Sequence, residues 1–477
     1  MNIRETAFYI IVIALSIYAW KDWFISLCGL IILAALVGHP TFPKSVFSIQ
    51  GLNLWNVLFA NVMLAWIFNR AGQGLLRNMS TIFKLFFILW LCVIIVGWIR
   101  MIADRDQLRG FTFLGLISEQ LINTIKWPLI SLPLFDGCHT RKRVKMVIAC
   151  IVVFFALFTV QIVRAVPQKA VRRSARVDLR EEVRSVSLSP NGAGKVMSGA
   201  PWAFLAVMPL LKKWKYRFLI LGLSGLSIYA IALTGSRSAY VASAATIVLL
   251  CFLRWRRAFL LLPIMLFILP IVFPASTKRM WSGFDSTSVS GEERMDENIV
   301  TSGRNMIWPI VIDKISESPV IGFGREATQR TGLTNKLAAT YGESEGVAVT
   351  HPHQAYLQML LDNGLVGLMI IVGLHLVLLF YSIRLFIERT DPLFSVVGGL
   401  TLALLTSHLV DYMGGQTFYA QAMDVGLWSS VGLTLRLYSE IKYHAFEPYA
   451  LWTSGLPVQS HSQGYYSLMR QYGGIDS

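Results

Sequence analysis

Long apolar segments recur through the chain, and they constrain its fold more than any other feature. They lie at about residues 7–20, 23–38, 52–68, 83–102, 112–135, 146–166, 199–211, 216–233, 238–253, 258–274, 364–385, 393–412 and 418–437. Each run is continuous rather than alternating, which favours membrane-spanning helices over a β-barrel. Hydrophobic residues make up 55% of the chain. The sequence therefore predicts an all-α polytopic membrane protein with about 12–13 transmembrane helices of roughly 20 residues each.

One polar stretch, residues 275–353, interrupts this apolar pattern. A loop of this length between membrane helices is uncommon unless it has a function. The chain is thus divided into five predicted regions. They are an N-terminal transmembrane bundle (1–184), a transmembrane core (185–274), the large loop (275–353), C-terminal transmembrane helices (354–437) and a cytoplasmic tail (438–477).

Local patterns predict two helices within and after this insert. Arg304 to Trp308, preceded by Thr301-Ser302-Gly303 as an N-cap, favours an amphipathic helix. Pro309 lies inside that pattern and predicts a kink or a later start. Gln354 to Leu361 is again helical, and Asp362-Asn363-Gly364 breaks it before the next span. This pattern indicates a short interfacial helix that leads into a transmembrane helix.

The formal charge of +16 comes mainly from basic residues in short loops. No basic helix or basic domain is evident that would bind nucleic acid, so the positive-inside rule explains the charge better. Basic clusters at 141–145, 212–217 and 254–257 predict cytoplasmic loops. Loop 167–198, the turn at 234–237 and the insert then fall on the outer face. The seven basic residues of loop 167–198, and an odd number of spans, oppose this topology.

Three arginines are candidates for binding phosphate groups. Arg237 stands at the outer end of a predicted helix, where free backbone N–H groups and a planar guanidinium suit a phosphate or diphosphate. Arg304 begins the helix of the insert, and Arg325 follows Gly322-Phe323-Gly324. Together the three predict a cationic pocket, although each alone also fits a snorkelling or solvated side chain.

His351 and His353 are candidates for acid–base chemistry, because histidine takes up a proton near neutral pH. A zinc pair and a hydrogen-bonded interfacial histidine are the alternatives. No further residues, including the five cysteines, have metal-ligand spacing, so neither a metal nor a cofactor is expected. Other ionisable residues are scattered in or near the spans without an evident relay: Glu119, His375, His408, Asp411 and Asp424.

Three stretches carry a family resemblance over about residues 185–385. They are Thr-Gly-Ser-Arg-Ser-Ala at 234–239, Ser302-Gly303-Arg304 with Trp308 running into 318–324, and His353 to Gln358 followed by 363–367, with a fainter match at Ser189-Pro190-Asn191. In this order and spacing they resemble the O-antigen ligase and O-antigen polymerase superfamily. Gln354 is a departure, since the family often has Asn after this histidine.

The resemblance implies a metal-independent glycosyltransferase of the bacterial inner membrane, with a GT-C-like fold and a periplasmic loop. Such an enzyme moves a glycan from an undecaprenyl-diphosphate carrier to a hydroxyl of another glycan, of lipid A–core or of a protein. By that likeness Arg237 and Arg304 bind the diphosphate and His353 activates the hydroxyl. Arg325 as a further diphosphate ligand and His351 as an auxiliary group are added from the sequence. The expected partners are this donor, its acceptor and membrane lipids, and not nucleic acid.

Two other classes of function remain open. A secondary transporter of a glycan or anionic solute predicts inverted repeats and charges at the membrane midplane. The sequence shows no internal repeat, and its polar groups gather at one face. A structural assembly subunit would use the insert as a docking domain. Substituting Arg237 or His353 separates these classes, because only an enzyme loses transfer activity while it still folds.

Overall fold

The structure is a computed structural model, and it confirms the predicted all-α class. It describes residues 3–39, 41–43, 45–46, 51–108, 112–165, 190–261, 304–341, 351–415 and 417–444. These residues form helices and connecting turns, and no strand occurs among them. Five of the described helices are long and apolar enough to cross a membrane: α4 (Thr81–Ala103), α8 (Arg141–Ala165), α13 (Trp214–Thr234), α21 (Ala355–Ile387) and α22 (Pro392–Asp411).

The remaining helices are shorter or, in the case of α23, less apolar. Three of them are also apolar: α1 (Ile3–Tyr18), α2 (Trp23–Ala34) and α14 (Arg237–Leu253). The others are α3 (Leu54–Arg70), α5 (Phe113–Gly115), the π-helix η3 (Leu116–Ile122), α6 (Asn123–Leu129), α7 (Ser131–Gly137), α11 (Pro190–Ser198), α12 (Ala200–Val207), α18 (Arg304–Ser316), α19 (Ala327–Arg330), α20 (Leu333–Tyr341) and α23 (Val425–His444). The predicted total of 12–13 spans stays a prediction.

Two predicted segments differ from the helices observed. The apolar run 112–135 is a succession of α5, η3, α6 and α7 rather than one regular helix, since a π-turn and Pro128 interrupt its hydrogen-bond ladder. The span predicted at 199–211 is preceded by α11, so residues 190–198 are helical and not loop. Pro190 begins α11, a position that proline tolerates because the first N–H groups of a helix have no partner.

Other predictions are met or fall outside the described residues. Helix α18 runs from Arg304 to Ser316 with Pro309 inside it, so its start is not delayed. Its predicted N-cap at 301–303, and most of the predicted span 258–274, lie outside the residues described. Helix α21 has a non-helical Gly364 (φ 64°, ψ −166°), which confirms the predicted break after a short first segment.

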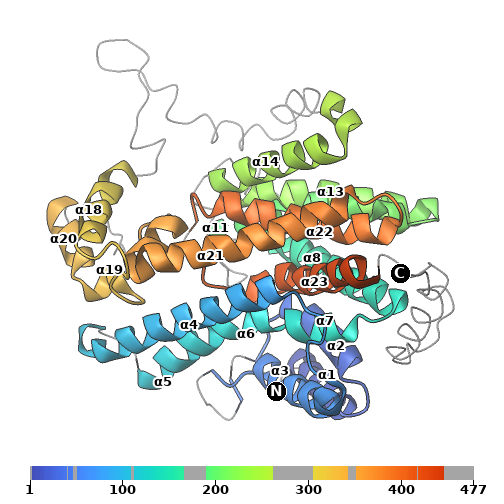
Figure 1. Ribbon diagram of the computed structural model, residues 1–477, viewed down its shortest axis with the longest axis horizontal. Helices are drawn as coiled ribbons and strands as arrows, with labels where there is room; N and C mark the ends of the chain where they lie inside the picture. The colour runs from blue at the N-terminus through green and yellow to red at the C-terminus, as the bar shows by residue number, and fades with distance from the viewer. Residues whose placement is uncertain are drawn as a thin grey trace, which may run out of the picture.

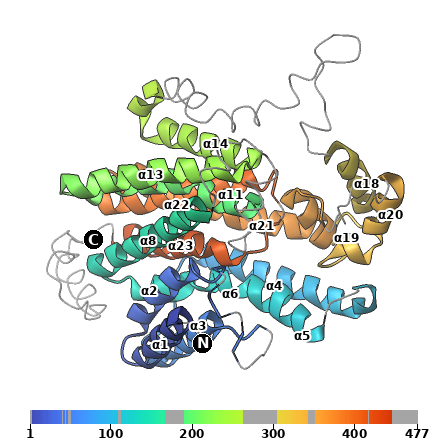
Figure 2. The same ribbon diagram turned by 180° about the vertical axis from the view of Figure 1, so that it is seen from behind.

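Helix α22 lies at the centre of the bundle (Figures 1 and 2). Helices α21, α22 and α23 run side by side, with α13 and α14 on one side and α4 and α6 on the other. Small residues allow this close packing: a Cβ placed on Gly398 of α22 would lie 2.3 Å from the backbone nitrogen of Phe386 in α21. Close backbone approach of this kind is the usual way in which transmembrane helices associate.

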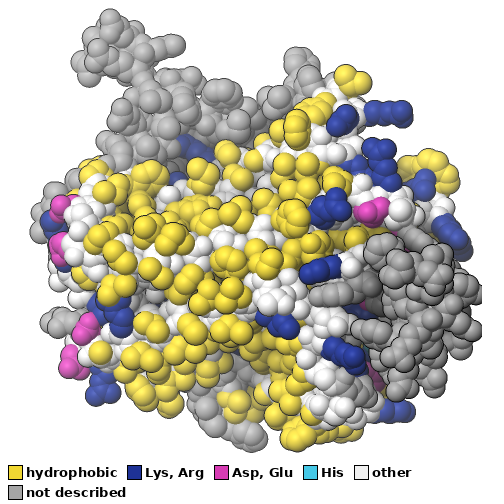
Figure 3. Space-filling model, viewed as in Figure 1, with side chains coloured by type: hydrophobic (Ala, Val, Ile, Leu, Met, Phe, Trp, Pro, Cys, Tyr) yellow, Lys and Arg dark blue, Asp and Glu magenta, His cyan; other side chains and the backbone are white. Residues whose placement is uncertain are grey.

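The outer faces of the bundle are apolar, and one of its ends is basic. Figure 3 shows a broad apolar belt, with Lys and Arg gathered near the ends of α13 and α14 and the turn between α21 and α22. Arg141 pairs with Asp391 (2.7 Å), and Arg254 donates to the carbonyl oxygens of Phe386 and Glu388 (2.6 Å each). Two of the basic clusters predicted to be cytoplasmic therefore meet at this end. Helices α18 to α20 lie beyond the opposite end (Figure 1).

Candidate functional site

A short docking loop, residues 318–324, fastens the insert to the break in α21. The break at Gly364 frees backbone groups on both of its sides. Phe323 N–H donates to Leu361 O (2.9 Å), and Leu365 N–H donates to Pro319 O (2.8 Å). A Cβ on Gly364 would lie 2.3 Å from Val320 C and O, so glycine is required both by this contact and by its positive φ. Two of the family-like stretches thus contact each other directly.

The turn that carries the two histidines is held from two directions. Trp308 of α18 donates from Nε1 to the carbonyl of Pro352 (3.1 Å), and Ala355 N–H donates to Tyr412 O (2.9 Å). His353 has φ +54°, a left-handed conformation that is costly for a residue other than glycine. The imidazole rings of His351 and His353 lie 4.3 Å apart, centroid to centroid.

Arg304 and Arg237 both begin helices close to this turn. Arg304 donates from Nη2 to the carbonyl of Gly414 (2.8 Å). A Cβ on Gly414 would lie 3.3 Å from Arg304 Nη1 and 2.9 Å from Ser238 Cβ, so α14 and α18 begin at the same place. Burial lowers the pKa of Arg304, Asp411 opposes this shift and Arg237 adds to it. The two guanidinium groups therefore lie close enough to interact electrostatically.

Both histidines have environments that favour the neutral imidazole. Burial lowers the pKa of His351 to about 4, and the neighbouring His353 adds to this shift. Burial, followed by the positive charge of Arg304, lowers the pKa of His353 from its ordinary value. A neutral imidazole beside fixed positive charge is able to accept a proton at neutral pH. We call Arg237, Arg304, His351 and His353 the arginine–histidine cluster.

A network of buried ionisable side chains lies beside this cluster, and it joins His408, Asp411 and Asp424, which are far apart in the sequence, with Lys195. Lys195 Nζ lies 3.2 Å from Asp424 Oδ1, and His408 Nε2 lies 3.2 Å from the same oxygen. Buried Asp411 hydrogen-bonds Ser238 and interacts electrostatically with Arg304, Lys195 and His408. Apolar surroundings strengthen such interactions, so this network sets the electrostatic potential behind Arg304.

Arg325 makes its described contacts elsewhere. Its Nε donates to Gln120 Oε1 (2.6 Å), and its guanidinium lies 3.8 Å from the centre of the Tyr419 ring. With His351 it lines a cavity of about 630 Å³, which we call the polar cavity. Neither the hydrogen bond nor the ring contact described for Arg325 is with Arg237 or Arg304. Its assignment to a diphosphate site therefore stays a prediction.

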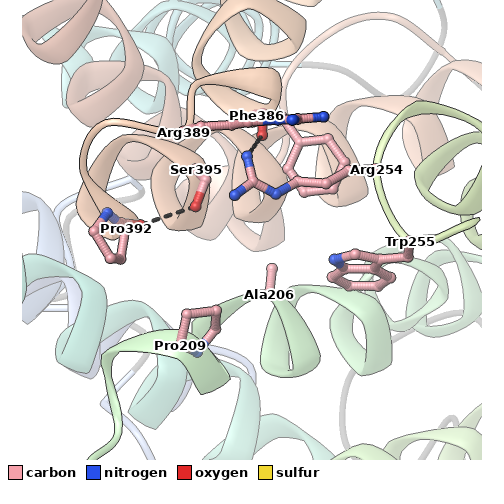
Figure 4. A pocket seen from close by; sticks show the side chains of 8 residues that line it. All are labelled: Ala206, Pro209, Arg254, Trp255, Phe386, Arg389, Pro392 and Ser395. Carbon is pink, nitrogen blue, oxygen red and sulfur yellow. Dashed lines mark hydrogen bonds between the residues drawn. The ribbon is translucent and has the colours of Figure 1, made fainter. Parts of the chain in front are cut away.

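A second, smaller pocket of about 130 Å³ lies at the basic end of the bundle (Figure 4). Arg254, Phe386, Pro392 and Ser395 are among its lining residues. Arg254 begins the turn after α14, whereas Arg237 begins α14 itself, so a whole helix separates this pocket from the arginine–histidine cluster. The pocket is not part of the candidate site.

The structure brings four of the five predicted site residues together and shows how the family-like stretches meet. Within the described ranges, no group of three or more His, Cys, Asp or Glu residues is arranged to hold a metal ion. The cluster offers two guanidinium groups, which are able to bind a diphosphate, beside an imidazole that is able to accept a proton.

Comparison with known families gives a match that covers the part of the chain that contains the candidate site. Residues 222–372 match the family described as O-antigen ligase. The matched segment contains all five predicted site residues, and it confirms the resemblance to the O-antigen ligase and O-antigen polymerase superfamily. The family supports a membrane glycan-transfer function in polysaccharide assembly, with a lipid-linked glycan and an acceptor as partners. No curated protein matched the chain.

Proposed function

We propose that the protein transfers a glycan from an undecaprenyl-diphosphate carrier to an acceptor hydroxyl at the periplasmic face of the bacterial inner membrane. The acceptor belongs to surface polysaccharide assembly, as a growing glycan or as lipid A–core. The observation that carries this proposal is the convergence of Arg237, Arg304 and His353, which come from three separate parts of the chain. A transporter or a scaffold gives no reason for that convergence.

The chemistry follows from the charges of the site. His353 accepts the proton of the acceptor hydroxyl, whose oxygen attacks the anomeric carbon of the donor sugar. The bond between that carbon and the phosphate oxygen breaks, and the carrier leaves as its diphosphate. Arg237 and Arg304 stabilise the negative charge that develops on the leaving group, an effect that is largest where water is scarce. In this scheme two fixed guanidinium groups do what a divalent cation does in other transferases.

Three contacts preorganise this chemistry. Gly414 O holds the Arg304 guanidinium, Pro352 O holds the indole of Trp308, and Tyr412 O holds the N–H of Ala355. The first segment of α21 and the start of α18 are thereby fixed against the end of α22. Preorganised donors need no rearrangement during the reaction, which supports a catalytic rather than a structural role.

The first test compares glycan transfer by the wild type, His353→Ala and Arg237→Ala at equal expression, in a strain that lacks the native gene. We expect both variants to accumulate carrier-linked glycan and to lose the surface polysaccharide ladder. His139→Ala and Arg257→Ala are matched controls, because both residues are exposed, and they lie beside or within basic clusters far from the site. The controls should retain the ladder.

The form of the ladder distinguishes the two acceptors. Loss of polymer with single repeat units still attached to lipid A–core indicates a polymerase. Loss of all attachment, with polymer retained on the carrier, indicates a ligase. If His353→Ala and Arg237→Ala both behave as wild type, the proposed site is wrong, and a transporter of a glycan or anionic solute becomes the better hypothesis.

A further inference from the structure

The polar cavity lies beside the arginine–histidine cluster but has a different chemistry. Its walls come from η3, α6, the region of α19, the first segment of α21 and the turn at 417–422. Its volume of about 630 Å³ lies within the range of roughly 300–1,000 Å³ that is typical of small-molecule sites. Neither Arg237 nor Arg304 is among its lining residues, whereas His351 is.

Two buried polar atoms in the cavity wall have no hydrogen-bond partner among the described residues. They are Nη1 of Arg325 and Oε1 of Gln358, and each side chain is only 7% exposed. One other group of each side chain is engaged: Arg325 Nε donates to Gln120 Oε1 (2.6 Å), and Gln358 Nε2 donates to Asp362 Oδ1 (2.9 Å). The wall therefore presents one donor and one acceptor that are held in place and are costly to leave unpaired.

A sugar hydroxyl supplies the partner that each of these atoms lacks, since it both donates and accepts hydrogen bonds. The rest of the lining fits the same kind of ligand. It combines carboxamides, which donate and accept hydrogen bonds, with Trp127 and Tyr419, whose ring faces are partly covered by Lys126 and Arg325. The Tyr419 ring is fixed, because its hydroxyl donates to Asp362 Oδ2 (3.0 Å) and accepts from Asn363 Nδ2 (2.8 Å).

The charges of the lining argue against an anionic ligand. Arg325 is accompanied by the carboxyl groups of Glu119, Glu326 and Asp362, which also line the cavity. Burial raises the pKa of the Glu326 carboxyl group, and the exposed Glu119 also lies in the wall. A neutral hydroxyl pairs with a carboxyl group in either protonation state, whereas an anion is repelled by the charged form. The lining also includes a strained residue: Glu326 has φ +59°, as unusual for a non-glycine residue as the φ of His353.

His351 joins the cavity to the cluster, because it lines the cavity and its ring lies 4.3 Å from that of His353. A sugar in the cavity therefore approaches His353 from the side of His351, while Arg304 influences His353 from the cluster. The donor's diphosphate requires the arginines. The ligand that reaches the histidines through the cavity is then the acceptor, which carries the attacking hydroxyl.

We propose that the polar cavity binds the terminal neutral sugars of the acceptor glycan through Arg325 and Gln358, and presents their hydroxyl to His353. This inference rests on the proposed function for the identity of the acceptor, but binding of sugar to the cavity is testable without transfer. It also gives Arg325 a role that differs from the diphosphate contact predicted from the sequence.

The binding test uses the full chain in detergent or nanodiscs. The probes are two oligosaccharides from the producing strain, one released by mild acid from its lipid-linked glycan and one from its lipid A–core, each labelled with a fluorophore at its reducing end. We expect saturable binding by the wild type, and binding weaker by about tenfold or more in Gln358→Leu, which removes a buried acceptor. Gln329→Trp, at a partly exposed wall residue, should block the cavity while leaving the buried network intact.

The control for these variants is Gln161→Leu in helix α8, outside the cavity lining, which removes a partly buried carboxamide that donates to Ala35 O (2.8 Å). It should bind the probes as the wild type does. His353→Ala should also bind the probes, since it lacks only the base. If the wild type binds neither probe, or if both cavity variants bind normally, the proposal is overturned, whether or not the protein transfers glycan.

A kinetic test shows whether the sugar that binds in the polar cavity belongs to the acceptor or to the donor. With the donor saturating, Gln358→Leu and Gln329→Trp should raise KM for the acceptor about tenfold and leave KM for the donor within about twofold. A rise in KM for the donor alone would assign the cavity to the donor glycan and overturn the proposal. Failure of the wild type to transfer any glycan would instead overturn the proposed function, and the binding result would still stand.

Discussion

At the scale of single residues, the protonation state of His353 is the property on which the proposed reaction depends. Burial and the charge of Arg304 lower its pKa, so the imidazole is neutral at neutral pH and becomes charged only as the pH falls. A general base works in its neutral form. Activity should therefore be complete above the pKa of His353 and be lost as the pH falls through it.

The pH profile of kcat/KM tests this directly. We expect the acidic midpoint of the wild type to lie below about 6.5, the ordinary histidine value. Arg304→Gln removes a positive charge, so it should raise the pKa of His353 and move the midpoint of the residual activity to higher pH. Arg257→Gln, at the basic end, should not move it. A wild-type midpoint above 6.5, or a downward shift in Arg304→Gln, contradicts the assignment.

The sequence located the residues of the arginine–histidine cluster because each lies beside a local signal, such as a helix start or a turn. It did not locate their partners. Arg304 contacts Gly414, 110 positions later, and Lys195 pairs with Asp424 across 229 positions. Contacts of that range depend on how helices pack, and no local pattern encodes them. The contact of Arg325 with Tyr419 was likewise not foreseen, since the position of Arg325 beside a glycine turn says nothing about a residue 94 positions later.

At the scale of elements, the break in α21 connects the fold to the site. The prediction of a helix end at 362–364 was correct, because Asp, Asn and Gly in succession disfavour a continued helix. What the sequence did not show is that the backbone groups freed there pair with the docking loop. The irregular run from α5 to α7 was missed for a related reason, since apolar periodicity does not distinguish a π-turn from an α-helix.

Gly364→Ala tests the docking loop. The new Cβ would clash with Val320 and would also require a left-handed alanine, a strain of about 1–3 kcal/mol. We expect the loop to detach. Trypsin added to membrane vesicles should then cleave the protein near Arg325 faster, and glycan transfer should fall about tenfold or more. Gly222→Ala in α13 is the control, because nothing lies within 4 Å of its Cβ position. Equal cleavage rates in the two variants would show that the contact does not hold the loop.

At the scale of the whole molecule, the two ends of the bundle are chemically different. One end gathers basic side chains, and the other carries the helices of the insert. The positive-inside rule predicts that the basic end faces the cytoplasm, which puts the arginine–histidine cluster on the periplasmic side. The sequence alone supplies the count of basic residues on which this orientation depends. The packing of the helices shows in addition that two of the three predicted basic clusters lie at the same end of the bundle.

Cysteine labelling tests the orientation. In a Cys92→Ala background, which removes the only exposed cysteine among the described residues, Ile312→Cys in α18 and Lys213→Cys at the basic end offer exposed thiols. A membrane-impermeant maleimide should label Ile312→Cys in cells whose outer membrane has been permeabilised, and Lys213→Cys only after lysis. The reverse pattern would place the site in the cytoplasm and remove the periplasmic carrier from the proposal.

The way in which the insert is fastened has a consequence for how such a protein diversifies. The docking loop is held through backbone groups, and the segment from Arg325 to His351 is anchored just before its start and just after its end. The residues that make these contacts lie outside the segment, so the contacts do not depend on the side chains within it. Substitutions or insertions between the anchors can therefore accumulate while the chemistry of diphosphate departure is left undisturbed. We therefore expect that exchanging this segment between relatives, with Arg325 and His351 kept, changes sugar specificity while the membrane helices stay the same.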